Sequence, residues 1–422
     1  MRKLRIILVW TLVSLFLQGG AYFLLNNKVQ KVMTPLPNAE PITLKLNATI
    51  PGSGLKNIQI SYAKDYLAYT ENGVLKIFNL VQGKQVFEKK SPSTTDKTLG
   101  VLTYQWLPDR NTLLYFYAKK NPNEVTTVTV YPPKAKVQPP SPPEELKTED
   151  PNQKIEKVIP KVDPKVVPKV VPEEPRIEKR YGNPHITELY TLELPESNDD
   201  TTPLDDRFNR SIDNLPKGGK IGNWVFSTKS NLIYLTVKNE STQLLMEIDV
   251  MKNLRTLNKS GEAIDNMAAS DRYGTLYVDS KVGNTHQVVA LDGTKRRIIS
   301  KNPNDRILGI RDGKVYIGEV INNELVKIKT TSDRSELTDN PSLKTEWEGL
   351  IPFENVRMLI GSKGQVIVYD HQITHIITDG QLKEIKLDGV ENYVSSDGAE
   401  LIKLNQQGTS TLVELKPLKS EE

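Results

Sequence analysis

The side chains that could carry out catalysis or bind a metal are few in this sequence. The chain of 422 residues has four histidines and no cysteine, so a thiolate nucleophile, a cysteine zinc site and a disulfide framework are excluded. His371 and His375 have the spacing that places two zinc ligands on one face of a helix. Residues 369–375 are instead typical of a strand hairpin, along which the two would lie roughly 13 Å apart, or closer if residues 371–372 form the turn. We therefore expect ordinary polar side chains at both positions.

Four aspartates, Asp271, Asp312, Asp379 and Asp397, stand in turns before a glycine. Aspartates in such turns commonly accept hydrogen bonds from their own backbone. Two of them could also form the carboxylate pair of a glycoside hydrolase, which needs a separation of about 5 to 9.5 Å. The sequence contains no phosphate-binding glycine loop, G-x-S-x-G elbow or H-E-x-x-H motif. We therefore predict no catalytic, cofactor-binding or metal-binding residues, and we expect that the protein is not an enzyme.

Short strands recur along the chain and would have to position any such residues. Four of them follow one another between residues 58 and 88, separated by hairpin turns such as Glu71-Asn-Gly73. A similar unit starts at Leu102. Later units centre on residues 231–235, 275–278, 314–317, 365–369 and 400–404.

The spacing of these units indicates the fold. It is roughly 35 to 50 residues once one insertion is set aside, and four strands per unit at this period are typical of propeller blades. We predict an all-β β-propeller over residues 41–419 with about seven blades, or six or eight if one unit is misjudged. A string of meanders or two stacked all-β domains is the alternative.

The last unit lacks a fourth strand, because only three strands lead to its end at residues 410–416. Residues 42–50 form an isolated strand pattern that alternates apolar and polar side chains. A ring of blades must join its ends. We therefore expect residues 42–50 to complete the last blade and close the ring.

Residues 104–115 read Tyr-Gln-Trp-Leu-Pro-Asp-Arg-Asn-Thr-Leu-Leu-Tyr, an aromatic residue, then Pro-Asp, a turn and Leu-x-Tyr. This pattern resembles the repeat of TolB-like propellers, which also occurs in dipeptidyl-peptidase-type propeller domains. Residues 62–69 and 394–402 are similar but degenerate. The resemblance implies a propeller and, because members of this class mostly act as scaffolds, a role in protein interaction. No WD dipeptide is present, and we expect no peptidase domain after Lys419.

A proline-rich insertion at residues 132–180 interrupts the repeats. Residues 158–173 have a four-residue period, Val-Ile-Pro-Lys in its first copy; so many prolines predict extended polyproline II or disorder. The flanking residues 126–130 and 186–194 look like the two strands of one blade hairpin. The insertion would then project from a blade, either as a tolerated loop expansion or as an arm that docks a partner. Residues 196–219 are expected to form a second long loop.

The N-terminal residues predict where the protein is located. Residues 6–25 form an uncharged apolar stretch long enough for one membrane-spanning helix of roughly 30 Å. Three basic residues within residues 1–5 favour a cytoplasmic N-terminus. No small-x-small cleavage pattern follows, so an uncleaved signal anchor is predicted, with a cleaved signal peptide as the alternative. Residues 26–40 would be a tether, and the bulk of the chain would be extracytoplasmic.

The composition narrows the class of partner. A net charge of +4 with 26% charged residues argues against a nucleic-acid-binding surface, and a cysteine-free exported chain favours a bacterial envelope. We therefore predict a single-pass, membrane-anchored propeller that acts as a protein-interaction or sensing scaffold with an envelope protein partner and no cofactor. The alternative is a glycan-active hydrolase with carboxylates in the central funnel. Trp106, Trp224 and Trp347 are expected to pack within blades.

Overall fold

The computed structural model describes residue 18 and residues 47–130, 175–199, 201–212, 220–238, 242–249, 251, 253–333 and 339–418. These residues contain thirty strands, which form seven four-stranded sheets and one two-stranded sheet. No helix within the described ranges is long and apolar enough to cross a membrane. The predicted anchor, apart from residue 18, the cytoplasmic N-terminus and the tether lie outside the described residues.

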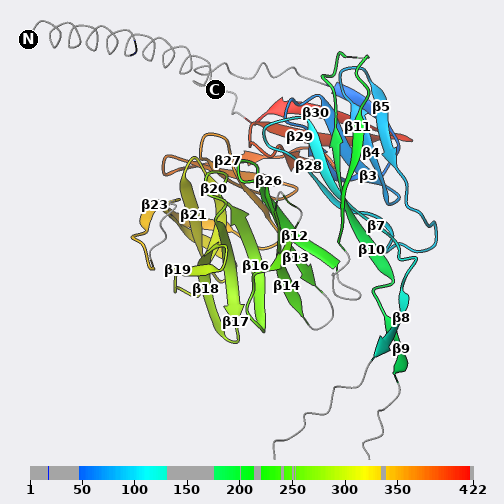
Figure 1. Ribbon diagram of the computed structural model, residues 1–422. Coiled ribbons are helices and arrows are strands. Elements are labelled where there is room, and N and C mark those ends of the chain that lie inside the picture. The colour runs from blue at the N-terminus through cyan, green and yellow to red at the C-terminus, as the bar shows by residue number, and fades with distance from the viewer. Residues whose placement is uncertain are drawn as a thin grey trace, which may run out of the picture.

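The seven four-stranded sheets are the blades of a β-propeller (Figure 1). Blades 1 to 3 consist of β2 (Lys56–Ile60), β3 (Tyr66–Glu71), β4 (Val74–Asn79) and β5 (Lys84–Lys89); β6 (Gly100–Trp106), β7 (Thr112–Lys120), β10 (His185–Glu193) and β11 (Asp205–Ile212); and β12 (Lys220–Ser227), β13 (Leu232–Lys238), β14 (Gln243–Ile248) and β15 (Leu254–Thr256).

Blades 4 to 7 follow the same order from the inner to the outer strand. They consist of β16 (Glu262–Ala269), β17 (Leu276–Val282), β18 (Thr285–Asp292) and β19 (Lys295–Ser300); β20 (Asp305–Arg311), β21 (Lys314–Ile321), β22 (Glu324–Ser332) and β23 (Lys344–Pro352); β24 (Arg357–Ile360), β25 (Val366–Tyr369), β26 (Ile373–Thr378) and β27 (Gln381–Lys386); and β28 (Glu391–Val394), β29 (Glu400–Gln407), β30 (Ser410–Pro417) and β1 (Asn47–Pro51). The predicted seven-bladed, all-β fold is confirmed.

Burial explains why the second strand of a blade is the most apolar. The four residues of β25, Val-Ile-Val-Tyr, are all buried, whereas every residue of β27 at the outside of the same blade is exposed or half-buried. Blades pack against their neighbours on both faces, so a strand near the middle needs a continuous apolar run rather than an alternating one. The turn Asn72-Gly73 joins β3 to β4 with positive φ at both residues, as a two-residue hairpin requires.

The ring closes where the first and the last strands of the described chain pair. β1 pairs with β30 in antiparallel register, with Asn47 opposite Glu414 and Pro51 opposite Ser410. Ile50 is fully buried in this blade. In Figure 1 the blue first strands and the red last strands lie side by side. Within the described residues, the predicted closing strand is therefore confirmed.

Blade 2 differs from the sequence prediction. Residues 126–130 do not pair with residues 186–194: β10 pairs with β7, while β8 (Val125–Val130) pairs with β9 (Arg176–Tyr181) in a separate two-stranded sheet, called the ribbon from here on. The third strand of a blade needs buried apolar side chains, which β10 supplies with Leu189 and Leu192, whereas no residue of β8 is buried. Residues 176–180, counted in the insertion from sequence, thus belong to a strand.

The predicted long loop at residues 196–219 is also wrong in part. Residues 205–212 form β11, the outer strand of blade 2, paired with β10 from Thr187 opposite Ile212 to Glu193 opposite Asp205. The strand reads Asp-Asp-Arg-Phe-Asn-Arg-Ser-Ile, and only Ile212 in it is buried. An outer strand covered on one side needs few apolar residues, so its pattern resembles that of a loop.

The strand order places the chain ends and the ribbon at opposite ends of the ring. In an antiparallel four-stranded blade, the first and third turns lie at one end and the second turn lies at the other. The chain enters β1, a fourth strand, and leaves β30, a third strand, at the end with the first and third turns, which we call the proximal face. The ribbon continues the β7–β10 connection, a second turn, and so leaves the opposite, distal face (Figure 1).

Candidate functional site

A pocket of about 460 Å³ lies between the inner strands of blades 1, 2, 6 and 7. Apart from five aliphatic residues, its wall consists of Asn57, Gln59, Thr70, Thr103, Tyr104, Gln105, Trp106, Arg357, Tyr369, Tyr393, Ser395 and Ser396. We call it the central pocket. Its position along the inner strands makes it the part of the propeller funnel where a ligand could contact several blades at once.

Hydrogen bonds between β2 and β6 fix one side of the central pocket. The Tyr104 hydroxyl donates to the carbonyl of Asn57 at 2.6 Å, and the Gln59 amide donates to the carbonyl of Tyr104 at 2.9 Å. The indole of Trp106 donates to the carbonyl of Gln59 at 3.2 Å. Asn57 has a left-handed φ of 56° at a register shift of β2, and this bulge brings its carbonyl to Tyr104. Burial raises the pKa of Tyr104, so its hydroxyl remains a donor.

The other side of the central pocket carries its only charged residue within the described ranges. The Arg357 guanidinium at the start of β24 lies over the ring of Tyr393 on β28, 4.5 Å from the ring centroid. This cation–π contact joins blade 6 to blade 7. The Tyr393 hydroxyl donates to Glu391 at 2.9 Å, and burial together with Glu391 raises the pKa of Tyr393 to about 12.

The side chains that line the central pocket are of types that can bind a polar ligand. Among the described residues, no carboxylate and no histidine lines it. Most glycoside hydrolases use a carboxylate pair, and general acid–base catalysis is most often carried out by histidine or a carboxylate. Amides, hydroxyls, aromatic rings and one guanidinium can instead orient and hold a polar ligand.

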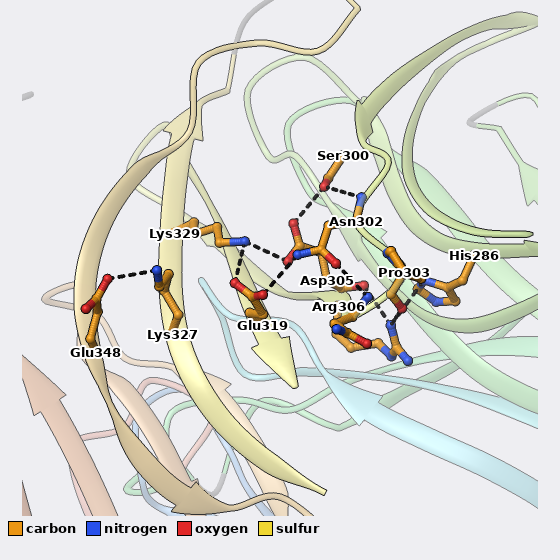
Figure 2. A network of polar contacts seen from close by, with 11 residues as sticks. His286, Ser300, Asn302, Pro303, Asp305, Arg306, Glu319, Lys327, Lys329 and Glu348 are labelled. Atoms are coloured by element: carbon orange, nitrogen blue, oxygen red, sulfur yellow. Dashed lines mark hydrogen bonds and ion pairs between the residues drawn. The ribbon is translucent and has the colours of Figure 1, made fainter. Parts of the chain in front are cut away.

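A second polar region lies between blades 4 and 5, and unlike the central pocket it contains charged side chains that pair with one another (Figure 2). Lys329 on β22 contacts Asp305 at 2.9 Å and Glu319 at 2.8 Å. Ser300 donates to Asp305 at 2.6 Å, and the side chain of Asn302 donates to Glu319 at 3.1 Å. We call these five residues the Lys329 network.

Each charge in the Lys329 network has an opposite charge beside it. The hydrogen bond from Lys329 lowers the pKa of Glu319. Burial lowers the pKa of Lys329, but the hydrogen bonds to Glu319 and Asp305 outweigh it and raise this pKa above its usual value. Asp305 is fully buried. The network therefore joins the strands of blade 5 to the end of β19.

Asp279 is a buried carboxylate close to this network. Its Oδ1 accepts a hydrogen bond from the backbone N–H of Ile307 at 2.6 Å, across the boundary of blades 4 and 5. Burial raises the pKa of Asp279 to about 8. His286 on β18 lies 3.1 Å from the Arg306 guanidinium (Figure 2), and burial lowers its pKa. Asp279 and His286 are thus both shifted towards their neutral forms.

His371 and His375 belong to one hairpin of blade 6. Asp370 accepts hydrogen bonds from the backbone of Gln372 and Ile373 and so forms the turn that contains the exposed His371. His375 lies on β26, 3.9 Å from Glu384 on β27. No group of three or more metal-ligating side chains occurs in the described part of the chain.

The four turn aspartates all lie on the proximal face, in the β16–β17, β20–β21, β26–β27 and β28–β29 turns, and none lines the central pocket. Asp397 accepts from Ala399 of its own turn at 3.2 Å and pairs with Lys64 of blade 1 at 2.9 Å. Asp271 accepts from the backbone of Thr228 in blade 3 at 3.3 Å. These two aspartates join neighbouring blades.

The predicted packing of Trp106, Trp224 and Trp347 is confirmed, because all three are buried.

Other residues of the candidate site and of the ribbon were not predicted from the sequence. Arg357 and Tyr393 were missed, since they are 36 residues apart (393 − 357) in different blades and belong to no motif. The ribbon exposes Val125, Ile177 and Tyr181, the last two at 71% and 72% of their surface.

Comparisons with known proteins add similarity at the level of fold. No protein-family model and no curated protein matches the chain. Among solved structures, the Cps50 (Swd1) β-propeller domain of Myceliophteria thermophila is 10% identical, with 87% of this chain and 97% of that chain covered at a TM-score of 0.46.

Two further propeller structures are similar. The Dos1 propeller is 11% identical, with 88% of this chain and 80% of that chain covered at a TM-score of 0.44. The acylaminoacyl peptidase of Pyrococcus horikoshii is 10% identical, with 80% and 45% covered at 0.41. At these identities they are similar in fold alone, and the TolB-like resemblance stays a prediction.

Proposed function

We propose that this protein is a membrane-anchored, extracytoplasmic β-propeller that acts as a protein-interaction or sensing scaffold in the cell envelope, without enzymatic activity. The observation that carries the proposal is the position of the chain ends and the ribbon at opposite faces of a closed ring. The resemblance to TolB-like repeats supports the scaffold role.

The ring would present its distal face to a partner. Residue 47 enters the ring on the proximal face, so an anchor at residues 6–25 would hold this face towards the membrane. The ribbon would then extend away from the membrane, together with the proline-rich residues that follow β8.

The ribbon has the properties of a contact element. An isolated two-stranded sheet is at best marginally stable in water, and the described residues of the ribbon bury nothing between them. Val125 lies opposite Tyr181 in the register, and Ile177 lies on the same face opposite Thr129. A partner that covered this face would bury three exposed apolar side chains and order the ribbon.

The central pocket supports a scaffold over the alternative of a glycan hydrolase. Its described lining has no carboxylate, and the four turn aspartates lie elsewhere. No specific observation favours hydrolysis.

The test combines protease accessibility with site-directed crosslinking in native membranes. We expect external protease to cleave the full chain outside the membrane, and a photo-crosslinker at Thr127 of the ribbon to capture one defined protein. A chain without residues 132–174 retains both ribbon strands, whereas an Ile177→Ser/Tyr181→Ser variant retains the proline-rich residues, so the two distinguish the ribbon from the insertion.

Leu350→Ser is the matched control, because Leu350 is 67% exposed on β23, far from the ribbon in sequence and in blade order. We expect the control to crosslink like the unaltered chain and the double variant to lose the crosslink. A chain that external protease reaches only after membranes are opened would refute the location. An unchanged crosslink in the double variant would refute the role of the ribbon.

A further inference from the structure

We propose that the central pocket is a binding site for a carboxylate-bearing peptide segment, held through the guanidinium of Arg357. This inference rests on the proposed scaffold function and specifies what the funnel of the ring recognises, separately from the ribbon.

The guanidinium of Arg357 lies over the ring of Tyr393, 4.5 Å from its centroid. No ion pair of the described residues includes it, whereas Lys329, Arg296 and Arg255 each contact a carboxylate at 2.9 Å or less. A guanidinium that lies over an aromatic ring keeps N–H donors at its edge.

Tyr393 holds the guanidinium in place. The phenol ring is 8% exposed and its hydroxyl is committed to Glu391, so the ring has little freedom to turn. Glu391 is not among the residues that line the pocket. The edge of a guanidinium matches the two oxygens of a carboxylate in a bidentate pair, so a ligand carboxylate would complete a site that is already oriented.

The charge and size of the pocket favour a peptide carboxylate. One lining cation balances one carboxylate, whereas a phosphate at neutral pH carries up to two charges. The volume of about 460 Å³ falls in the range of roughly 300 to 1,000 Å³ that is typical of ligand sites. Gln105 and Ser396 add an amide and a hydroxyl to the wall, and such groups can hydrogen-bond to peptide N–H and C=O groups.

The experiment measures binding of small peptides to the purified full chain by calorimetry. The probe is Gly-Gly-Glu with an amidated C-terminus, so that its one carboxylate is that of the glutamate side chain. Its match is Gly-Gly-Gln with an amidated C-terminus, which has the same shape and no carboxylate. Glutarate tests whether a carboxylate without a peptide is sufficient. We expect Gly-Gly-Glu alone to bind measurably, and more weakly as salt is raised.

Arg357→Gln should weaken this binding by about tenfold or more, because it removes the charged hydrogen bonds. Arg357→Lys should weaken it less, since it keeps the charge and loses the bidentate geometry. The control is Arg207→Gln, which removes a guanidinium that is 53% exposed on β11, the outer strand of blade 2, and should leave the affinity unchanged.

Equal binding of both peptides, or an unchanged affinity in Arg357→Gln, would overturn the proposal. Glutarate that binds as tightly as Gly-Gly-Glu would overturn the assignment to a peptide. Failure of every probe to bind would refute the pocket as a carboxylate site and leave the ribbon crosslink, and with it the scaffold function, unaffected.

Discussion

Lys329 on β22, the third strand of blade 5, and Arg357 on β24, the inner strand of blade 6, are two cations of the same ring whose charges are compensated in different ways. The Lys329 side chain is 14% exposed and lies between Asp305 and Glu319. Arg357 is exposed to the central pocket and lies over an uncharged ring. A buried charge without a partner costs several kcal/mol, so the first site needs both carboxylates, whereas the second can leave its charge open to a ligand.

The largest loss of stability is expected when Asp305 is replaced. We expect Asp305→Ala to lower the free energy of unfolding by about 3 to 5 kcal/mol, because it removes the buried partner of the half-buried Lys329 and leaves the Ser300 hydroxyl without an acceptor. Urea unfolding at neutral pH, followed by tyrosine and tryptophan fluorescence, measures this loss.

The matched control is Glu348→Ala. Glu348 pairs with Lys327 at 2.8 Å, but its side chain is 64% exposed, and such pairs contribute roughly 0 to 1 kcal/mol. Equal losses in both variants would contradict the difference between a buried network and a surface pair.

Asp279 should make the stability of the protein depend on pH. Its pKa is raised from 3.8 to about 8, so between these values the folded protein retains a proton that the unfolded chain releases, and stability falls as the pH rises. We expect Asp279→Asn, which carries no titrating carboxyl, to gain about 1.4 kcal/mol over the unaltered protein for each pH unit in this window.

The measurement is urea unfolding of both proteins at about pH 5, 6 and 7. His286 titrates in both, so its contribution cancels in the difference. A difference that does not change with pH would show that Asp279 is ionised in the folded protein.

The smallest effect on stability is expected at Arg357. Arg357→Gln removes a cation–π contact at an exposed side chain, worth about 0.5 to 1 kcal/mol, and should shift the urea midpoint only slightly while it weakens peptide binding by about tenfold or more. A loss as large as that of Asp305→Ala would instead give Arg357 a structural role.

The sequence predicts the regular part of the fold because period and turns are local signals. Residues 71–73 and the strands on both sides of them read as a hairpin, and the three-stranded last unit leaves a place that only the early strand can fill. The polar β11 and the pairing of β8 with β9 leave no such signal, since their partners are set by which residues the blade buries.

The candidate site could not be predicted from the sequence for a related reason. Arg357 and Tyr393 meet only because blades 6 and 7 are neighbours in a closed ring. Their types are common and their spacing follows no motif. The histidines and turn aspartates stood out by type, but none of them lines the central pocket.

The closing blade also determines how the ring would respond to force. β1 is joined to β30 through five residue pairs, and their hydrogen bonds run across the strands. A pull on residue 47 against a partner held at the ribbon acts along β1, from the proximal to the distal face. All these hydrogen bonds would then be loaded together in shear, rather than broken one after another. The pairing of β1 with β30 that completes the ring is therefore also suited to transmit tension across it.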